Sequence, residues 1–384
     1  MKSRAWFLSL LVAAATSASA VSFTTLITTP VVIEGLTNDN DGNLYTPGRA
    51  AAATDACPVY RVNIATPTLV VVGTIPPQTP ACSPSGLAFG PDGKLYVSNG
   101  DKIFAFTPDA ATPPVATVFA SGVQGTNGIA FDWKGNLWTG DGTTGVGRVW
   151  KITPAGAVTE VFRIQPMANE VNLVAGVGGI GRDVRTLGPG TITVTPTSRN
   201  AANMLGSQPL VANGLAFDDH RNLYIADTAR GAIWSVRVKN DGTVDADMGC
   251  DTTFTANTLC MSQLFVAHPL LEGADGIVLD VAGNIWVSAN ERNAIVLVRD
   301  EGRVVEVFRN PVDMGTQLRN TGPLESPTSP VLVGHQFCTA NSDGNRRDNF
   351  PNTAGEIGGP GQPRGKISCL DQRVSIRGMR LPVH

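Results

Sequence analysis

The sequence predicts an all-β fold, a six-bladed β-propeller built from four-stranded antiparallel blades. The first observation is a hairpin-sized motif that recurs along the chain, and the second is a set of further strand signals after most of its copies. The third is composition: among 384 residues there are 42 Gly and 26 Pro, while 42% are hydrophobic and only 16% charged. This composition is typical of short strands joined by many turns.

Residues 1–20 are predicted to form a signal peptide. A basic start is followed by an apolar run over 5–15, which is too short to span a bilayer, and small residues at 18–20 are typical of a cleavage site. We therefore expect a secreted or periplasmic protein whose mature part, residues 21–384, is a single propeller domain. No later apolar run is long enough to predict a membrane span.

Each copy of the motif has a polar residue, a Gly, a short apolar strand, a turn and a second apolar strand. The polar residue lies ten positions before the Leu or Ile that begins the second strand in five copies. The turns are rich in Asn, Asp and Gly, which tolerate left-handed backbone, so each copy is predicted to be a hairpin. The five copies span residues 34–48, 85–100, 127–141, 213–227 and 275–290, and a degenerate sixth spans 329–344.

Two further strands complete most blades, as at 148–153 and 157–164. The third and fourth copies are unusually far apart, which we interpret as an inserted loop at about 165–212; a seventh, eroded blade there is the alternative. The strand at 22–29 is expected to close the ring by pairing into the last blade, whose final strand is predicted at 366–371.

The first position of the repeat carries the chemistry. Inner strands of a propeller surround its axis, so equivalent positions at their starts lie on one ring. This ring would hold Glu34, Ser85, Asn127, Asn213 and Asp275, with Ser329 as the sixth member. Oxygen ligands suit hard divalent cations, and two carboxylates match the charge of one such ion. The sequence therefore predicts a central metal site.

The charge of the chain indicates which partners it can have, and its cysteine content indicates the compartment. With 29 Lys and Arg against 32 Asp and Glu, the net charge of −3 gives no footprint for nucleic acid. Six cysteines in an exported chain suggest disulfides, and pairing between nearest neighbours is our expectation. The expected pairs are Cys57–Cys82, Cys250–Cys260 and Cys338–Cys369. We expect a monomer that acts on a small molecule.

The motifs EG–LY, NGIAFD, NGLAFD and DGI–D resemble the senescence marker protein (regucalcin) and gluconolactonase family, and more distantly paraoxonase and diisopropyl fluorophosphatase. The resemblance covers residues 34 to about 345. It implies a six-bladed propeller with a catalytic divalent cation at its axis, most simply Ca²⁺, with Mn²⁺, Mg²⁺ and Zn²⁺ as alternatives. The ligands that it implies are Glu34, Asn127, Asn213 and Asp275, the set that the repeat register selects independently.

The resemblance also implies a reaction. Members of the family hydrolyse lactones, and some cleave organophosphate esters, with the cation acting as a Lewis acid. The expected catalytic residues are Asp275, as general base or nucleophile, and Asn127. Gly125 stands where sugar-lactone members have an Arg, which weakens the expectation of an aldonolactone substrate. Two alternatives stay open: a non-catalytic binding propeller with a structural metal, and an enzyme similar to strictosidine synthase.

Three further features could contribute to the site. The insertion at 165–212 is expected at the ring end, where it could form a lid or substrate wall. His268, seven residues before Asp275, is the histidine that could transfer a proton there. Polar residues after the second strands are expected to rim the same mouth: Asp101, Asp141, Asp227, Asn290 and Asn341.

Overall fold

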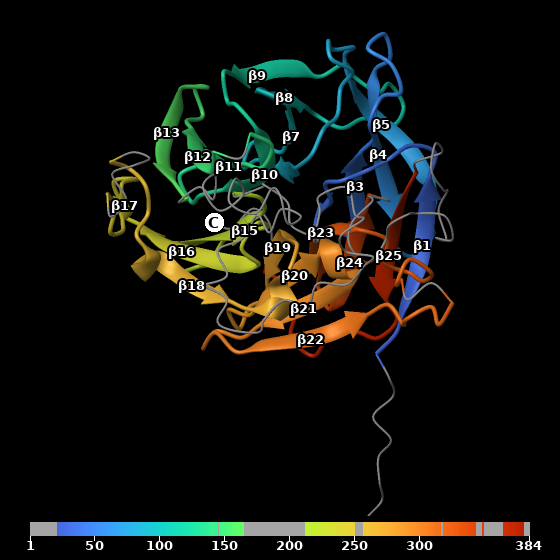
Figure 1. Cartoon of the computed structure of the whole chain (residues 1–384). Helices are drawn as coiled ribbons and strands as arrows, with labels where there is room; N and C mark the ends of the chain where they lie inside the picture. Colours follow the sequence, from blue (N-terminus) through green and yellow to red (C-terminus); the bar gives the residue numbers. More distant parts are fainter. Residues whose placement is uncertain are drawn as a thin grey trace, which may run out of the picture.

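The computed structural model has the predicted six-bladed β-propeller architecture (Figure 1). The model describes residues 21–144, 146–164, 212–249, 256–315, 318–342, 348 and 364–379. The predicted signal peptide and almost all of the predicted insertion lie outside these residues. No helix within the described ranges is long and apolar enough to cross a membrane.

The first three blades follow one another along the chain, each as an antiparallel sheet whose strands pair in sequence order. Their innermost strands begin close to the polar residue of each repeat. Blade one contains β2 (Thr37–Asn38), β3 (Asn43–Pro47), β4 (Cys57–Asn63) and β5 (Leu69–Ile75). Blade two contains β6 (Leu87–Phe89), β7 (Leu95–Asn99), β8 (Lys102–Phe106) and β9 (Thr117–Ser121). Blade three contains β10 (Thr126–Phe131), β11 (Leu137–Asp141), β12 (Arg148–Ile152) and β13 (Val158–Arg163).

Blade four departs from the four-stranded pattern because two short strands share the outer edge of β16. It contains β14 (Leu215–Phe217), β15 (Asn222–Asp227), β16 (Ala232–Val238), β17 (Val244–Asp245) and β18 (Leu264–Ala267). Blade five contains β19 (Ala274–Leu279), β20 (Ile285–Ala289), β21 (Ala294–Val298) and β22 (Val304–Arg309). Three short 3₁₀ turns lie around them: η2 (Met261–Gln263), η3 (Pro269–Leu271) and η4 (Asn290–Arg292).

Blade six joins the two ends of the described chain. It contains β23 (Pro327–Val333), β24 (Gln336–Asn341), β25 (Gly365–Leu370) and, as its outermost strand, β1 (Phe23–Thr29). The blue β1 lies beside the red β25 in Figure 1. The predicted closure by the strand at 22–29 is therefore confirmed. Pairing of the two chain ends in one sheet holds the ring shut.

The number of blades follows from the packing of blade three against blade four. A Cβ atom added to Gly128 would lie 2.8 Å from the Cα atom of Gly214, so the inner strands of these blades touch directly. No blade fits between them. The alternative of a seventh blade between 165 and 212 is excluded, while the structure of the insertion itself lies outside the described residues.

The hydrophobic core is divided among the interfaces between neighbouring blades. In the described part of the chain there are six clusters of buried side chains, and each joins two adjacent blades, including blades six and one. Between blades three and four, for example, Trp138 packs edge-on against Phe217, with ring centroids 5.8 Å apart. Radial packing of this kind buries both faces of every blade.

An aspartate-centred turn recurs at the end of the inner strand. Asp132 accepts hydrogen bonds from the backbone N–H groups of Lys134 and Asn136, both at 2.9 Å. It also accepts from the Asn136 amide at 2.8 Å and from Trp138 Nε1 at 2.9 Å. Equivalent turns surround Asp39, Asp218 and Asp280. The predicted turn signals are therefore confirmed, and their aspartates serve the hairpins.

Two of the three predicted disulfides are confirmed. Cys57 is bonded to Cys82, and Cys338 to Cys369. The second pair joins β24 to β25, where the two cysteines face each other in register. Cys260 is also disulfide-bonded. Cys250, its predicted partner, lies outside the described residues.

Candidate metal centre and adjoining pocket

The polar residues of the repeat form a ring. In the first five blades the glycine after the polar residue lies so close to the next inner strand that no side chain would fit there. A Cβ atom on Gly35 would lie 2.1 Å from the Ser85 carbonyl oxygen. The same approach joins Gly86 to the Asn127 carbonyl oxygen at 2.2 Å. In the same way, Gly128 lies against the carbonyl oxygen of Asn213, Gly214 against that of Asp275, and Gly276 against that of Thr328. The ring order is thus Glu34, Ser85, Asn127, Asn213, Asp275 and Thr328.

The sixth ring position is Thr328, one residue before the expected Ser329. A Cβ on Gly276 would lie 2.5 Å from the Thr328 carbonyl oxygen, and Thr328 Oγ1 donates a hydrogen bond of 2.6 Å to the Glu34 carbonyl oxygen. This bond closes the ring between blades six and one. The register was misjudged because the sixth copy has Ser329 where the other copies have Gly, so the motif could be aligned one residue late.

Asn213 presents a buried oxygen without a hydrogen-bond donor. The side chain is 1% exposed, and its Nδ2 donates to Thr228 Oγ1 at 3.0 Å. Thr228 gives its single proton to the Ala274 carbonyl oxygen at 2.6 Å, so it can only accept from Asn213, and this fixes the orientation of the amide. Within the described structure, Asn213 Oδ1 has no hydrogen-bond partner. Such an atom requires an explanation, because an unsatisfied buried acceptor is costly.

Glu34 and Asn127 meet across the ring. Asn127 Nδ2 lies 3.3 Å from Glu34 Oε1, and the other carboxylate oxygen accepts from Arg49 Nη2. A Cβ on Gly142 would lie 2.5 Å from Asn127 Nδ2, so a glycine is needed there to make room for the amide. Arg49 was not predicted. It follows the second strand of its hairpin, the position where the sequence predicted rim residues in other blades.

Asp275 is held by one of the predicted rim residues. The aspartate is 5% exposed, and its Oδ2 accepts a hydrogen bond of 2.8 Å from Asn290 Nδ2. Asn290 belongs to η4, directly after the second strand of blade five. This contact fixes the orientation of the Asp275 carboxylate at its ring position. The ring residue and the rim residue of one hairpin therefore act as a pair.

Other predicted rim residues are occupied by structural contacts. Asp227 forms a buried ion pair of 2.8 Å with Arg230 and accepts from Trp234 Nε1 at 3.0 Å. Asp141 pairs with Arg148 at 3.0 Å. Asn341 Oδ1 accepts from the Glu325 backbone N–H at 2.9 Å. These contacts hold loops in place; of the five predicted residues, Asp101 lines the pocket described next.

A pocket of about 400 Å³ opens beside the ring over blades one to three. Ring residues and polar loop residues line it together. Its lining includes Glu34, Ser85, Asn127, Arg49, Asp101 and Lys102. It is the larger of two described cavities, and its contact with three ring residues makes it the candidate substrate pocket.

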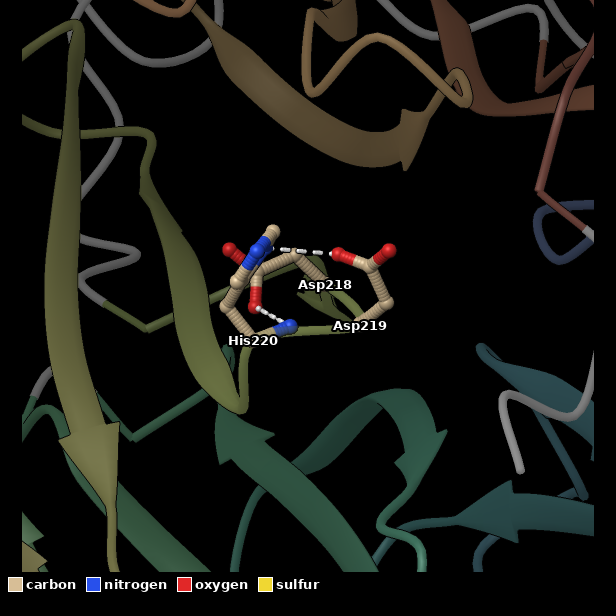
Figure 2. Close-up of side chains that lie close together, drawn as sticks. All are labelled: Asp218, Asp219 and His220. Atoms are coloured by element: carbon tan, nitrogen blue, oxygen red, sulfur yellow. Dashed lines mark hydrogen bonds and ion pairs between the residues drawn. The ribbon is translucent and has the colours of Figure 1, made fainter.

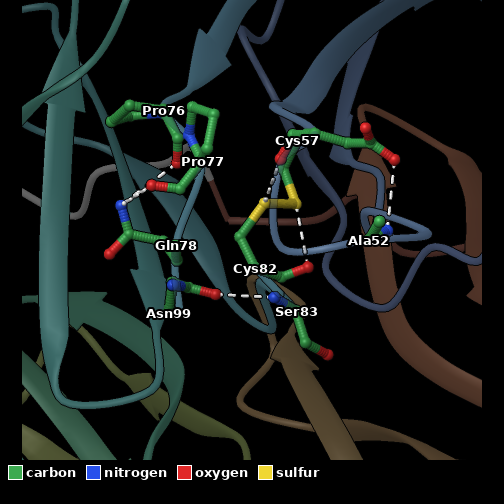
Figure 3. The surroundings of a disulfide bond; sticks show 9 residues. Ala52, Cys57, Pro76, Pro77, Gln78, Cys82, Ser83 and Asn99 are labelled. Atoms are coloured by element: carbon green, nitrogen blue, oxygen red, sulfur yellow. Dashed lines mark hydrogen bonds between the residues drawn. A yellow bond between two sulfur atoms is a disulfide. The ribbon is translucent and has the colours of Figure 1, made fainter. Parts of the chain in front are cut away.

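One wall of this pocket is held by a disulfide, as Figure 3 shows. The segment 76–83 connects blades one and two, and the Cys57–Cys82 bond ties it to β4. The Ser83 backbone N–H donates to Asn99 Oδ1 at 2.8 Å, and Gln78 Nε2 donates to the Pro77 carbonyl oxygen at 2.9 Å. The wall is therefore fixed to blades one and two on both sides.

The channel below the ring is apolar. Two residues after each ring position, the inner strands present Leu36, Leu87, Ile129, Leu215, Ile277 and Pro330 to a cavity of about 90 Å³. Met379, from the segment after β25, also lines it, and its backbone N–H bonds to the Leu279 carbonyl oxygen at 3.1 Å. This cavity offers no charged side chain, so polar ligands are expected on the pocket side of the ring.

His268 caps a short helix. Its Nδ1 accepts from the Leu270 backbone N–H at 3.1 Å at the start of η3. Burial lowers the pKa of His268, and the nearby Arg292 lowers it further. The capping bond requires an unprotonated Nδ1, which the lowered pKa favours. His268 has this structural role; its predicted part in proton transfer stays a prediction.

Figure 2 shows a second cluster of potential ligands, formed by Asp218, Asp219 and His220. It lies in the turn between β14 and β15, whereas Asn213 precedes the opposite end of β14. His220 Nδ1 is 2.7 Å from Asp219 Oδ1, and both side chains are largely exposed, at 76% and 69%. Asp218 already accepts the hydrogen bonds of the recurring turn. The cluster is thus explained by the hairpin.

Comparison with known proteins identifies a related family. Residues 170–323 match the family described as the SMP-30/gluconolactonase/LRE-like region. The predicted resemblance to this family is confirmed. The matched segment contains Asn213 and Asp275, whereas Glu34 and Asn127 precede it. No curated protein is significantly similar to this sequence.

Solved structures share the fold at low sequence identity. Regucalcin from Agrobacterium tumefaciens, described as a calcium-binding protein, aligns with a TM-score of 0.56 at 16% identity, covering 95% of this chain and 97% of its own. A luciferin-regenerating enzyme gives 0.55 at 12% identity, with coverage of 94% and 98%. The PQQ-bound aldose sugar dehydrogenase from Streptomyces coelicolor gives 0.50 at 15%, with coverage of 92% and 99%. The likeness shows a propeller fold that hosts different chemistries.

Proposed function

We propose that this protein is an exported hydrolase that depends on a divalent cation and cleaves a lactone or another ester. The observation that carries the proposal is Asn213 Oδ1, a buried carbonyl oxygen with no hydrogen-bond donor on a ring of oxygen-bearing side chains. A hard cation would satisfy this oxygen. The match of residues 170–323 to the SMP-30/gluconolactonase/LRE-like region supports the hydrolase class.

Glu34, Asn127, Asn213 and Asp275 would hold the cation. All four offer oxygen atoms, and their two carboxylates balance a divalent charge. Ca²⁺ fits this set best, with Mn²⁺, Mg²⁺ and Zn²⁺ as alternatives. When bound, the cation would supply Lewis-acid stabilisation of the oxyanion that develops on the substrate. The calcium-binding description of the regucalcin structure supports Ca²⁺ as the first ion to test.

The residues of the chain would share the remaining tasks. Asp275, oriented by Asn290 at 2.8 Å, would act as general base on the attacking water or as nucleophile. In the base route, the hydroxyl of water joins the acyl carbon, the acyl C–O bond breaks, and the proton passes to the leaving alkoxide. Asn127, held next to Glu34 at 3.3 Å, would orient the reacting group from its own ring position, two places from Asp275.

Export and a monomeric state are part of the proposal. Residues 1–20 would be removed on export, leaving residues 21–384 as one propeller domain. The disulfides Cys57–Cys82 and Cys338–Cys369 support this compartment, because structural disulfides persist in oxidising surroundings. The substrate would be a small molecule that fits the pocket of about 400 Å³.

A binding propeller is the second candidate, and Arg49 is the observation that favours it. Its guanidinium contacts the Glu34 carboxylate, so part of the negative charge of the ring is neutralised by the protein itself. A metal would then stabilise the fold without taking part in turnover. The two candidates differ in what chelation changes, because a structural ion affects melting while a catalytic ion also affects turnover.

The experiment is a panel of lactones and aryl esters assayed with chelator and then with each metal restored. We expect turnover to vanish with chelator and to return with one ion. Asp275→Asn should lower kcat by at least about 100-fold, because a general base contributes on this scale. Asp219→Asn, in the exposed cluster of blade four, is the matched control and should retain activity. Full activity in Asp275→Asn would refute the mechanism.

A further inference from the structure

The pocket beside the ring contains two cationic side chains. Arg49 follows β3 in blade one, and Lys102 begins β8 in blade two, and both line the same pocket of about 400 Å³. Lys102 Nζ donates to Gln78 Oε1 at 3.3 Å, on the wall held by the disulfide. A lysine and an arginine that share one pocket can hold an anion between them.

Arg49 has hydrogen-bonding capacity left over. Its Nη2 donates to Glu34, while its Nε is buried with no partner in the described structure. A guanidinium carries five N–H donors, so its accessible N–H groups can donate to a carboxylate in the pocket while Nη2 contacts Glu34. The side chain is 36% exposed, so it remains accessible from the pocket.

The charge balance of the site favours an anion only when a cation is bound to the ring. Within the pocket, Arg49 and Lys102 are offset by Glu34 and Asp101. Of the charges considered, only the −1 of Asp275 then remains. The proposed function requires a divalent ion, whose +2 charge exceeds this and makes the whole site positive. Aromatic side chains are missing from the described lining, so the pocket offers charge and hydrogen bonds in place of ring stacking.

We propose that the substrate carries a carboxylate separate from its scissile ester, and that Arg49 and Lys102 bind this carboxylate as specificity-determining residues. The inference rests on the proposed hydrolase function and deepens it by naming the substrate class, a carboxylated lactone. The ester would lie over the ring, while the carboxylate would lie toward blades one and two.

The test compares two lactones of equal ring size, γ-carboxy-γ-butyrolactone and neutral γ-valerolactone. We expect wild-type kcat/KM to favour the carboxylated lactone by at least tenfold with the active metal, and Lys102→Met to remove most of this preference through KM. Arg49→Lys should keep part of it, because it keeps the charge and loses the planar guanidinium with its several N–H donors. Lys94→Met, in the turn at the opposite end of blade two, should behave as wild type.

A calorimetric titration with α-hydroxyglutarate, the product of the carboxylated lactone, separates this inference from the proposed function. Metal-dependent binding that weakens at least tenfold in Lys102→Met supports the carboxylate site, even if neither lactone is hydrolysed and the hydrolase proposal fails. Equal or better hydrolysis of γ-valerolactone by the wild type overturns the inference while the hydrolase proposal stands. Absence of both binding and turnover with these compounds overturns the inference, while the hydrolase proposal is decided by the panel of lactones and aryl esters.

Discussion

At the residue scale, the molecule depends on pairs made of a polar residue and a glycine. The sequence predicted five of the six ring positions because the same polar–Gly pair marks the inner strand in the first five blades. The structure supplies the reason, since the glycine lets neighbouring strands touch. Arg49 and Thr228 could not be predicted in the same way. Their roles depend on contacts between loops, and no repeated pattern marks them.

The ring contacts predict that Gly214→Ala destabilises the fold. A Cβ at this position would lie 2.5 Å from the Asp275 carbonyl oxygen and 2.7 Å from the Gly276 Cα atom, which are backbone atoms that cannot rotate away. We expect the free energy of unfolding in urea to fall by about 1–3 kcal/mol. Gly315→Ala is the control, because its nearest neighbour is a side-chain atom at 3.3 Å. Equal stability of Gly214→Ala and wild type would contradict the tight ring.

At the scale of single elements, hairpins were the most predictable part. Their turns place Gly42, Gly135 and Gly283 at positive φ, as the Asn, Asp and Gly signals indicated. Arg221 occupies the same turn position in blade four with φ of 68°, and its guanidinium stacks on Trp133 at 5.1 Å. Turn chemistry alone does not predict an arginine at this position. Its guanidinium contacts the neighbouring blade, and such a contact cannot be inferred from the turn sequence. The short η3 was also missed, although His268 and Pro269 are typical of such a start.

The cap of η3 predicts a pH effect on stability. The pKa of His268 is lowered in the folded state by burial and by Arg292, so the neutral form is favoured there. Its contribution to stability is present above the ordinary value of 6.5 and is lost as pH falls through the folded pKa. His268→Asn keeps a capping acceptor without a titrating group. We expect its Tm to fall less than that of wild type between about pH 7 and pH 5. An identical fall in Tm in both proteins would show that protonation of His268 does not cause the loss of stability.

At the scale of the whole molecule, closure links the beginning of the described chain to its end. The strand signal at 22–29 predicted this closure, because a propeller with an open sheet edge would be exposed to aggregation. The pocket could not be predicted. It forms where the wall at 76–83 meets the loops of three blades, and the sequence gives no distance between these segments. The direct contact between blades three and four also could not be predicted from the sequence.

Closure predicts that Phe23 is an anchor. Its ring lies 5.0 Å from that of Phe308 in blade five and 5.9 Å from that of Phe337 in blade six, and the residue is 6% exposed. Phe23→Ala should lower the free energy of unfolding by about 3 kcal/mol. Val281→Ala, at an apolar residue that is 47% exposed, is the control and should change it little. Similar stabilities of the two variants would argue against an anchoring role for β1.

The central claim is that the polar ring holds a divalent cation, and calorimetric titration of Ca²⁺ into chelator-treated protein tests it most directly. We predict one ion per chain, with affinity reduced at least about tenfold in Asn213→Ala and Asp275→Asn. Asp219→Asn should bind as wild type does. Binding that survives both ring substitutions but is lost in Asp219→Asn would contradict the claim, as would a wild type that binds neither Ca²⁺ nor Mn²⁺, Mg²⁺ or Zn²⁺.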